Sequence, residues 1–182
     1  MRKRAIDIVI SMIGLFGLAP MFVIVAVMIK FDSAGPIFFR QERMGRGLNP
    51  FCIIKFRTMT SDMTNTTPSL AIVSSARITR IGRWLRSLKI DELPQLVNVL
   101  KGDMSLVGPR PELRRYVELR RHEYEMLLAV RPGMTDPASL AYHDEARRLA
   151  HAKDPEKEYV TKILPAKIRL SQQYVAVSTI CC

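Results

Sequence analysis

Two adjacent carboxylates, Asp91 and Glu92, stand in the stretch LKIDELPQLVNVLKGDMSLVGPRPEL, residues 88–113. The nearby cations are Arg86, Lys89 and Arg110. Cations beside a carboxylate favour its ionised form and also attract phosphate. An ionised carboxylate can attack phosphorus as a nucleophile, and a second acid can accept a proton. The pattern therefore indicates phosphoryl-transfer chemistry.

Each acid also has a simpler structural interpretation. Asp91 is favoured as a helix N-cap, Pro94 fits the first turn, and Glu92 complements the helix dipole. These interpretations explain the acids singly, but not the acid pair together with the basic loop Gly108–Pro111. Neighbouring side chains on a helix point about 100° apart, so we expect the two acids to have separate roles.

Residues 36–59 predict a β-hairpin, because aromatic and β-branched residues flank a Gly-rich connection. Its second strand places Lys55 and Arg57 on one face, at positions i and i+2. These cations could join the acids. The alternative is two solvated charges on a half-buried strand.

The N-terminal segment from Ile8 to Ile29 has 22 residues and no charge. A spanning helix needs about 20 such residues, so a buried core helix, a single span and a re-entrant hairpin compete. The basic residues that flank it are Arg2, Lys3 and Arg4 upstream, and Lys30, Arg40, Arg43 and Arg46 downstream. Basic flanks favour the cytoplasmic side, so both ends prefer one face. A helix broken at Ala19–Pro20 satisfies both flanks.

The remaining segments predict a mainly helical α+β protein. Residues 76–90 read as a basic amphipathic helix with Trp84, suited either to a membrane interface or to an arginine-rich outer face. We expect a short apolar helix ending at Gly102, an exposed helix over 111–130, and loops over 60–75 and 131–137.

The composition limits the partners. The chain has 182 residues and a net charge of +11, which predicts one domain and anionic partners. Its three cysteines give neither a disulfide framework nor zinc spacing, so a reducing environment is expected. Nucleic acid is not expected, because no recognition motif accompanies the charge.

Four segments carry a family resemblance, in this order behind the apolar N-terminus: PIFFRQERMG, FCIIKFRTM, LRSLKIDELPQLVNVLKGDMSLVGPRP and VRPGMT. They resemble the bacterial sugar transferases, the monotopic polyprenyl-phosphate phosphoglycosyl transferases, in a short catalytic-core form. The resemblance covers Arg2 to Thr135. It implies a re-entrant helix over residues 1–31, broken at Pro20, and a catalytic domain over 32–182.

The resemblance also implies the roles of the site residues. Asp91 is the expected nucleophile and Mg²⁺ ligand, and Glu92 the expected proton acceptor. The expected substrate-binding residues are Lys55, Arg57, Arg86, Arg110, Pro111 and Arg131.

The implied reaction moves a sugar 1-phosphate from a UDP-sugar to a polyprenyl phosphate and releases UMP, at the cytoplasmic face of the bacterial inner membrane. It serves exopolysaccharide or other glycoconjugate assembly. The alternative is a membrane-tethered scaffold or anionic-polymer binder without catalysis. The sequence is compatible with a homodimer. Residues 136–148 depart from many relatives, which leaves the sugar open, and the C-terminus is expected to be short.

Overall fold

The computed structural model describes residues 2–60, 77–150 and 152–180, so nearly all of the loop predicted over 60–75 lies outside the described residues. The described chain is mainly helical with short strands, as predicted for an α+β protein. It divides into two compact units. The first comprises residues 1–41 and 53–100, and the second residues 42–52 and 101–182. The predicted division at residue 31 stays a prediction.

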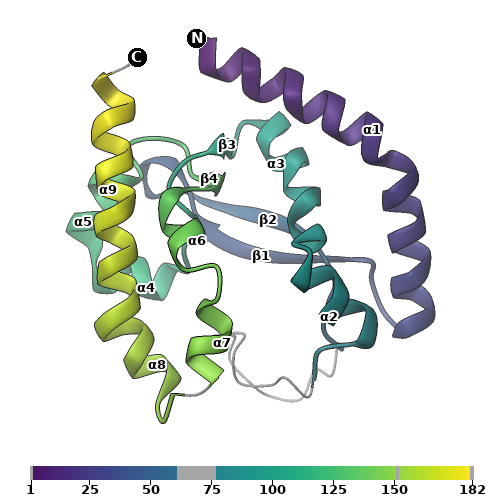
Figure 1. The fold of residues 1–182 in the computed structure, drawn as a ribbon. Coiled ribbons are helices and arrows are strands. Elements are labelled where there is room, and N and C mark those ends of the chain that lie inside the picture. Colours follow the sequence, from purple (N-terminus) through teal and green to yellow (C-terminus); the bar gives the residue numbers. More distant parts are fainter. Residues whose placement is uncertain (1, 61–76, 151, 181–182) are drawn as a thin grey trace. The chain divides into compact units, whose positions relative to one another are not determined.

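The first unit begins with α1 (Arg2–Asp32), one uninterrupted α-helix of 31 residues with Pro20 inside it. The break predicted at Ala19–Pro20 therefore does not interrupt the helix. The helix instead changes direction along its length (Figure 1). A proline within a helix removes one backbone hydrogen bond and crowds the preceding turn, so it bends a helix without necessarily ending it.

The outward surface of α1 is apolar and exposed. Within the described part of the chain, α1 alone is long and apolar enough to cross a membrane, and 11% of its most apolar stretch is buried. Phe16, for example, is 82% exposed. A core helix would be mostly covered by protein, so the core-helix interpretation is wrong for α1.

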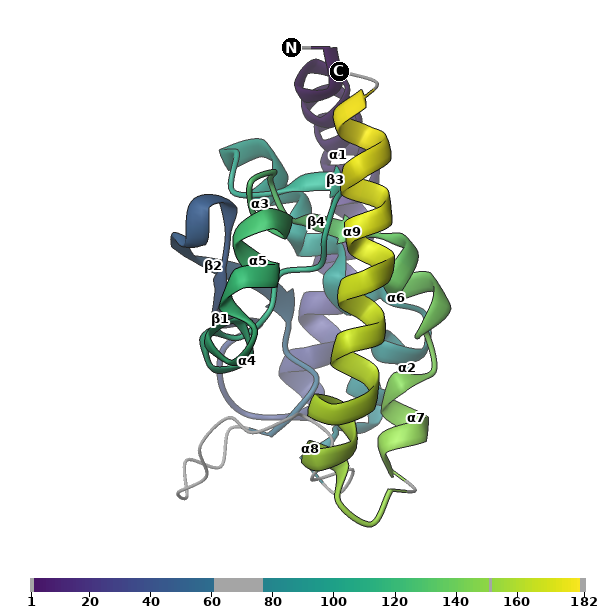
Figure 2. The ribbon, with the colours of Figure 1, turned by 90° about the vertical axis from the view of Figure 1, so that its left-hand side faces the viewer.

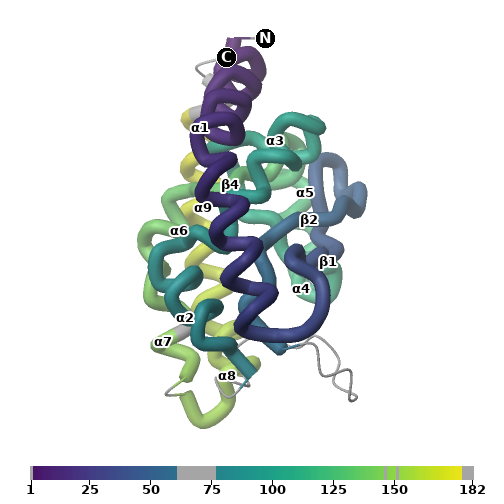
Figure 3. The backbone as a smooth tube through the Cα atoms, turned by 90° about the vertical axis from the view of Figure 1, so that its right-hand side faces the viewer, coloured from purple at the N-terminus to yellow at the C-terminus, as the bar shows by residue number. Residues whose placement is uncertain are grey.

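One face of α1 packs along the rest of the first unit (Figure 3). Its C-terminal half contributes Val25 and Ile29 to a core with Phe56 and Leu85. Nearer the N-terminus, Asp7 and Ser11 are buried on this face, and a Cβ added to Gly14 would lie 3.1 Å from Leu96.

Both ends of α1 are tied to other helices of the first unit. The Arg4 guanidinium donates to the carbonyls of Val99 and Leu100, at 2.5 and 3.0 Å, at the end of α3 (Leu96–Lys101). At the other end, Asp32 accepts a 3.0 Å hydrogen bond from the Ile81 amide at the start of α2 (Arg80–Ser87). These contacts satisfy backbone groups that helix ends leave unpaired.

The predicted helix over 76–90 is shorter in the structure. The Thr79 hydroxyl accepts from the Gly82 amide and starts α2 at Arg80. Ile78 instead forms an isolated bridge with Met59. After α2, the 3₁₀-helix η3 (Ile90–Gln95) precedes α3, and Gly102 follows with a φ of +95°. The predicted end at Gly102 is therefore confirmed.

The predicted hairpin is also confirmed. It consists of β1 (Phe38–Met44) and β2 (Pro50–Phe56), joined through the 3₁₀ turn η1 (Arg46–Leu48). The two parts of the hairpin fall into different units, because residues 42–52 belong to the second unit.

The second unit contains a parallel strand pair, β3 (Ser105–Val107) with β4 (Gly133–Thr135), in the register Ser105 to Gly133. A loop was predicted over 131–137, so this strand is a correction. A Cβ at Gly133 would lie 2.1 Å from the Gly108 nitrogen. The two backbones approach so closely that only glycine fits at positions 108 and 133. Strands of three residues are too short to show a pattern in the sequence.

Helices make up most of the rest of the second unit. They are α4 (Arg114–Leu119), α5 (Arg121–Leu127), α6 (Pro137–Ala141), α7 (Glu145–Ala150), α8 (Pro155–Glu158), the π-helical turn η4 (Tyr159–Ile163) and α9 (Leu164–Ile180). The long α9 lies beside α5 and α6 (Figure 2). The single exposed helix predicted over 111–130 is wrong, because the chain breaks at Arg120 and buries Tyr116 and Tyr124.

A buried carboxylate, Glu112, connects three segments of the second unit. Its side chain accepts from Arg43 at 2.8 Å and from the Tyr159 hydroxyl at 2.6 Å. Its backbone carbonyl accepts from the Met44 amide at 3.0 Å. Burial raises the pKa of Glu112, but the charges of Arg43 and Lys167 and the Tyr159 hydrogen bond outweigh it, so the pKa lies below its ordinary 4.5.

This network predicts an acid-dependent loss of stability. A depressed folded-state pKa contributes stability that is complete above the unfolded pKa, about 4.3, and is lost as the pH falls through the folded pKa. Glu112→Gln should therefore cost about 3 kcal/mol at pH 7, and its difference from wild type should shrink below about pH 4. Urea unfolding across this pH range measures both quantities.

Glu118→Gln, on the exposed side of α4, is the matched control and should show neither effect. A Glu112→Gln deficit that stays constant down to pH 3 would contradict the ionic account of the network.

Candidate active site

The two acids lie in η3, where Lys89 occupies the N-cap position. Lys89 has a left-handed backbone, with φ 58° and ψ 18°, and makes no side-chain cap. The interpretation of Asp91 as an N-cap is therefore wrong. Glu92 lies in the first turn, as expected for an acid that complements a helix dipole, and Asp91 lies in the same turn.

Asp91 is 8% exposed, and its buried Oδ1 has no hydrogen-bond partner. Burial raises the pKa of Asp91 above its ordinary value. The positive charge of Lys55 opposes this shift, Glu92 adds to it, and Arg86 and Lys89 oppose it. A buried polar atom without a partner costs about 1–3 kcal/mol, so this oxygen is maintained at the expense of stability.

Glu92 has a different environment from Asp91. Its Oε1 lies 2.7 Å from Lys55 Nζ, in an ion pair whose side chains are 15% and 19% exposed. Lys55 comes from β2, so the prediction that this strand brings a cation to the acids is confirmed for Lys55. The adjacent acids therefore differ chemically: one is paired with a cation, and the other has an oxygen without a partner.

Arg86 extends the positive environment from α2. Its Nε donates to the Thr58 hydroxyl at 2.8 Å. Burial lowers the pKa of Arg86, while the negative charges of Asp91 and Glu92 oppose that shift. Arg86 is therefore close enough to act electrostatically on both acids, and Thr58, which the sequence did not single out, holds its guanidinium.

Arg57, predicted to share a face with Lys55, has a different partner in the structure. It is almost fully buried. Its guanidinium donates to the carbonyls of Ser33 and Ala34, at 2.6 and 2.9 Å. It thus fixes the segment that follows α1, and its expected contact with substrate stays a prediction.

The other expected substrate-binding residues, Arg110, Pro111 and Arg131, belong to the second unit. Arg131 Nε donates to the Gly102 carbonyl at 2.9 Å. Arg110 lines a cavity of about 20 Å³, room for about one water, together with Glu112 and Asp136. The first unit thus gathers the two acids with Lys55 and Arg86, while the second unit carries the other three residues.

The two acids offer carboxylate oxygens of the kind that bind magnesium. Among the described residues, no three His, Cys, Asp or Glu side chains converge as a metal cluster. Mg²⁺ commonly binds through one or two carboxylates, substrate phosphates and water, so it does not need such a cluster. The buried, partnerless Oδ1 of Asp91 fits a ligand of this kind. The assignment of Asp91 to Mg²⁺ stays a prediction.

Comparison with known proteins agrees with the motif order. The profile of the family described as bacterial sugar transferase matches residues 1–177. The chain is 41% identical over 143 residues to a UDP-N-acetylgalactosamine-undecaprenyl-phosphate N-acetylgalactosaminephosphotransferase of Aeromonas hydrophila, covering 77% of this chain and 34% of the relative. It is 44% identical over 143 residues to the UDP-glucose:undecaprenyl-phosphate glucose-1-phosphate transferase of Caulobacter vibrioides, covering 77% of this chain and 54% of the relative.

A third relative is the exopolysaccharide production protein PSS of Rhizobium leguminosarum bv. phaseoli, 43% identical over 146 residues, with 76% of this chain and 72% of the relative covered. The chain thus spans about a third and about half of the first two relatives and most of the third. The family profile covers nearly the whole sequence. The chain belongs to the bacterial sugar transferase family.

Proposed function

We propose that the protein transfers a sugar 1-phosphate from a UDP-sugar to undecaprenyl phosphate and releases UMP. The observation that carries this proposal is the buried Asp91 carboxylate, whose Oδ1 has no partner although Lys55 and Arg86 act on it electrostatically. Undecaprenyl phosphate and UDP-sugars are the substrates in the names of the relatives from Aeromonas and Caulobacter.

In the first step, an Asp91 carboxylate oxygen attacks the phosphorus that bears the sugar. A new O–P bond forms on Asp91. The bond between that phosphorus and the bridging oxygen breaks, and UMP leaves with the electron pair. The raised pKa of Asp91 supports this role, because a more basic carboxylate is the stronger nucleophile once it is ionised.

In the second step, an oxygen of the lipid phosphate attacks the same phosphorus. The Asp91–phosphorus bond breaks, which restores the carboxylate and yields the lipid diphosphate sugar. Glu92 accepts the proton of the attacking phosphate. Its Oε1 lies 2.7 Å from Lys55 Nζ, so a phosphate held by Lys55 would lie beside the carboxylate that takes the proton, which supports this role.

Cations offset the repulsion between the carboxylate and a diphosphate. Lys55 and Arg86 supply positive charge from the first unit. Arg110 stands between Pro109 and Pro111, and the fixed φ of proline stiffens its loop. A guanidinium on a stiff loop can bind phosphate through two hydrogen bonds at a smaller entropic cost. Arg57 and Arg131 complete the proposed set of substrate contacts.

We assign Mg²⁺ as the cofactor, with Asp91 as its protein ligand. When bound, Mg²⁺ neutralises diphosphate charge and polarises the phosphoryl oxygens.

For the donor we propose only its class, a UDP-sugar, and not the identity of the sugar. The two relatives above name N-acetylgalactosamine and glucose. Residues after Thr135, where this sequence departs from many relatives, form the buried Asp136 cap and α6. UDP-N-acetylgalactosamine and UDP-glucose are therefore the first donors to test. The expected process is exopolysaccharide or related glycoconjugate synthesis.

We further propose that α1 enters and leaves the same leaflet. Arg4 binds the end of α3 and Asp32 binds the start of α2, so both ends of α1 contact one polar unit. A spanning helix places its ends on opposite sides of a hydrocarbon core of about 30 Å. The two contacts and the basic flanks support a catalytic domain on the cytoplasmic face of the bacterial inner membrane.

Covalent catalysis predicts an adduct. Incubation with Mg²⁺ and a donor sugar nucleotide, without lipid, should add one sugar phosphate to Asp91, because the second step has no acceptor. Intact-mass and peptide mass spectrometry measure it. Asp91→Asn should remain folded, carry no adduct and lose at least about a thousandfold of the rate, as expected when a nucleophile is removed.

Asp103→Asn, twelve positions further along the chain, is the control and should behave as wild type. Steady UMP release by wild type with an adduct on another residue would overturn the assignment of Asp91.

The topology predicts protection of both ends of α1 in intact cells. Single cysteines are placed at Arg2 and Ala34 in a protein whose Cys52, Cys181 and Cys182 are replaced by serine. A membrane-impermeant thiol reagent should label neither site until the membrane is permeabilised, and both afterwards. Labelling of position 2 alone from outside would establish a span. Pro20→Leu should increase that labelled fraction, because it restores a helical hydrogen bond.

A further inference from the structure

Lys89 has a backbone conformation that is unusual for its residue type. Its φ of 58° is in the left-handed region, and among the described residues that are not glycine only Leu48, with φ 61°, shares a positive φ. Left-handed backbone is unfavourable for a residue with a side chain, because Cβ crowds the following carbonyl oxygen. Glycine or asparagine normally fills this position after a helix. A lysine at this position therefore needs a compensating role.

The Lys89 side chain is exposed at the surface of the first unit. Lys55 is paired with Glu92, and Arg86 binds Thr58, whereas Lys89 makes no side-chain hydrogen bond or ion pair within the described ranges. Its charge nevertheless acts on Asp91, two positions along the chain. Lys89 is thus the outermost of the cations that act on the proposed nucleophile.

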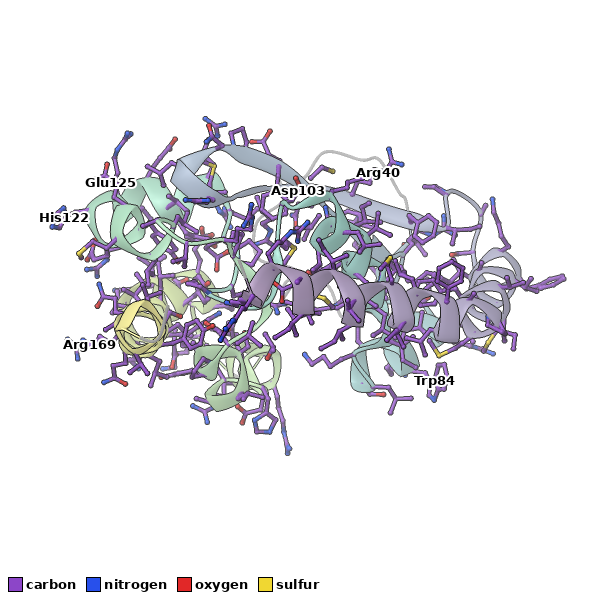
Figure 4. The ribbon with its side chains drawn as sticks, turned by 90° about the horizontal axis from the view of Figure 1, so that it is seen from above. Arg40, Trp84, Asp103, His122, Glu125 and Arg169 are labelled. Carbon is purple, nitrogen blue, oxygen red and sulfur yellow. The ribbon has the colours of Figure 1, made fainter. Side chains whose placement is uncertain are left out.

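The exposed residues near Lys89 are of the types found where a protein surface contacts a membrane. Leu88 is 55% exposed and Trp84, one helical turn before it, is 47% exposed. The Trp84 side chain points outward from α2 (Figure 4). Exposed tryptophan and leucine beside basic residues are typical of a surface that rests on lipid headgroups. An ammonium at such a place meets phosphate that is presented by the membrane, whereas a soluble sugar nucleotide arrives from water.

We propose that Lys89 binds the phosphate of the lipid acceptor and determines affinity for that substrate. This inference rests on the proposed function, and it separates the two substrates. The cations already held by Glu92 and Thr58 serve the diphosphate of the donor, and Lys89 serves the phosphate of undecaprenyl phosphate. The unfavourable backbone is offset by this contact, which is formed when the acceptor is present.

The central variant is Lys89→Gly, which removes the charge and also relieves the backbone. We expect a melting temperature at least as high as that of wild type, together with a KM for undecaprenyl phosphate raised about tenfold, or 1.4 kcal/mol. The single-turnover release of UMP without acceptor should change by clearly less than the acceptor KM does, because there Lys89 acts only through its charge on Asp91. Lys89→Arg should keep the acceptor KM within about threefold, because it keeps the charge.

Leu48→Gly is the matched control. It relieves the same backbone conformation in η1, at a residue without charge. Its acceptor KM should equal that of wild type. An unchanged acceptor KM in Lys89→Gly, or an equal loss in the single-turnover release of UMP, would overturn the proposal.

A binding assay makes the test independent of turnover. Wild-type protein should bind nanodiscs with undecaprenyl phosphate more tightly than nanodiscs with undecaprenol, and Lys89→Gly should lose about tenfold of this preference. Nanodiscs of phosphatidylglycerol distinguish the two sources of phosphate. An equal loss of binding to phosphatidylglycerol would assign Lys89 to general membrane attraction and overturn the acceptor-specific proposal. If wild type releases no UMP with any donor, the proposed function fails; a selective loss of undecaprenyl phosphate binding in Lys89→Gly would then still support Lys89 as a site for the lipid phosphate.

Discussion

Removal of the Asp91 carboxylate from water is the constraint on which the first unit depends. A buried carboxylate is costly unless cations surround it. Strand β2 supplies Lys55, and α2 supplies Arg86. The left-handed turn at Lys89 then starts a 3₁₀-helix in which one acid pairs with a cation and the other keeps an oxygen without a partner. The two neighbouring carboxylates therefore have different environments, and this difference suits them to different chemical roles.

The N-terminal helix follows from the same requirement. The proposed reaction between a lipid phosphate and a buried acid would require the acid to lie near a membrane surface. Helix α1 meets that need with one apolar, exposed face and one face that packs on the catalytic unit. Its polar ends bind backbone groups of α2 and α3, through Asp32 and Arg4. Helix α1 and the two acids therefore belong to one packed unit, so changes at the ends of α1 should affect the acids.

Local patterns predicted much of this arrangement. The hairpin, the helix end at Gly102 and the approach of Lys55 to the acids follow from alternation, glycine and strand periodicity. The predictions that the structure corrected depend on long-range contacts. Thr79 and the close approach of Gly82 to Thr58 shorten α2, and three-residue strands such as β4 carry too few residues for a pattern. The burial that leaves Asp91 Oδ1 without a partner is a tertiary property that no local sequence pattern records.

The most direct test of a covalent Asp91 intermediate is isotope exchange between UMP and the sugar nucleotide. The protein is incubated with Mg²⁺, unlabelled UDP-N-acetylgalactosamine or UDP-glucose, and radiolabelled UMP, with no lipid acceptor. A two-step mechanism reverses its first step, so label should enter the sugar nucleotide, and Asp91→Asn should abolish the exchange. Turnover with lipid but no exchange without it would indicate direct transfer and contradict the role of Asp91 as the nucleophile.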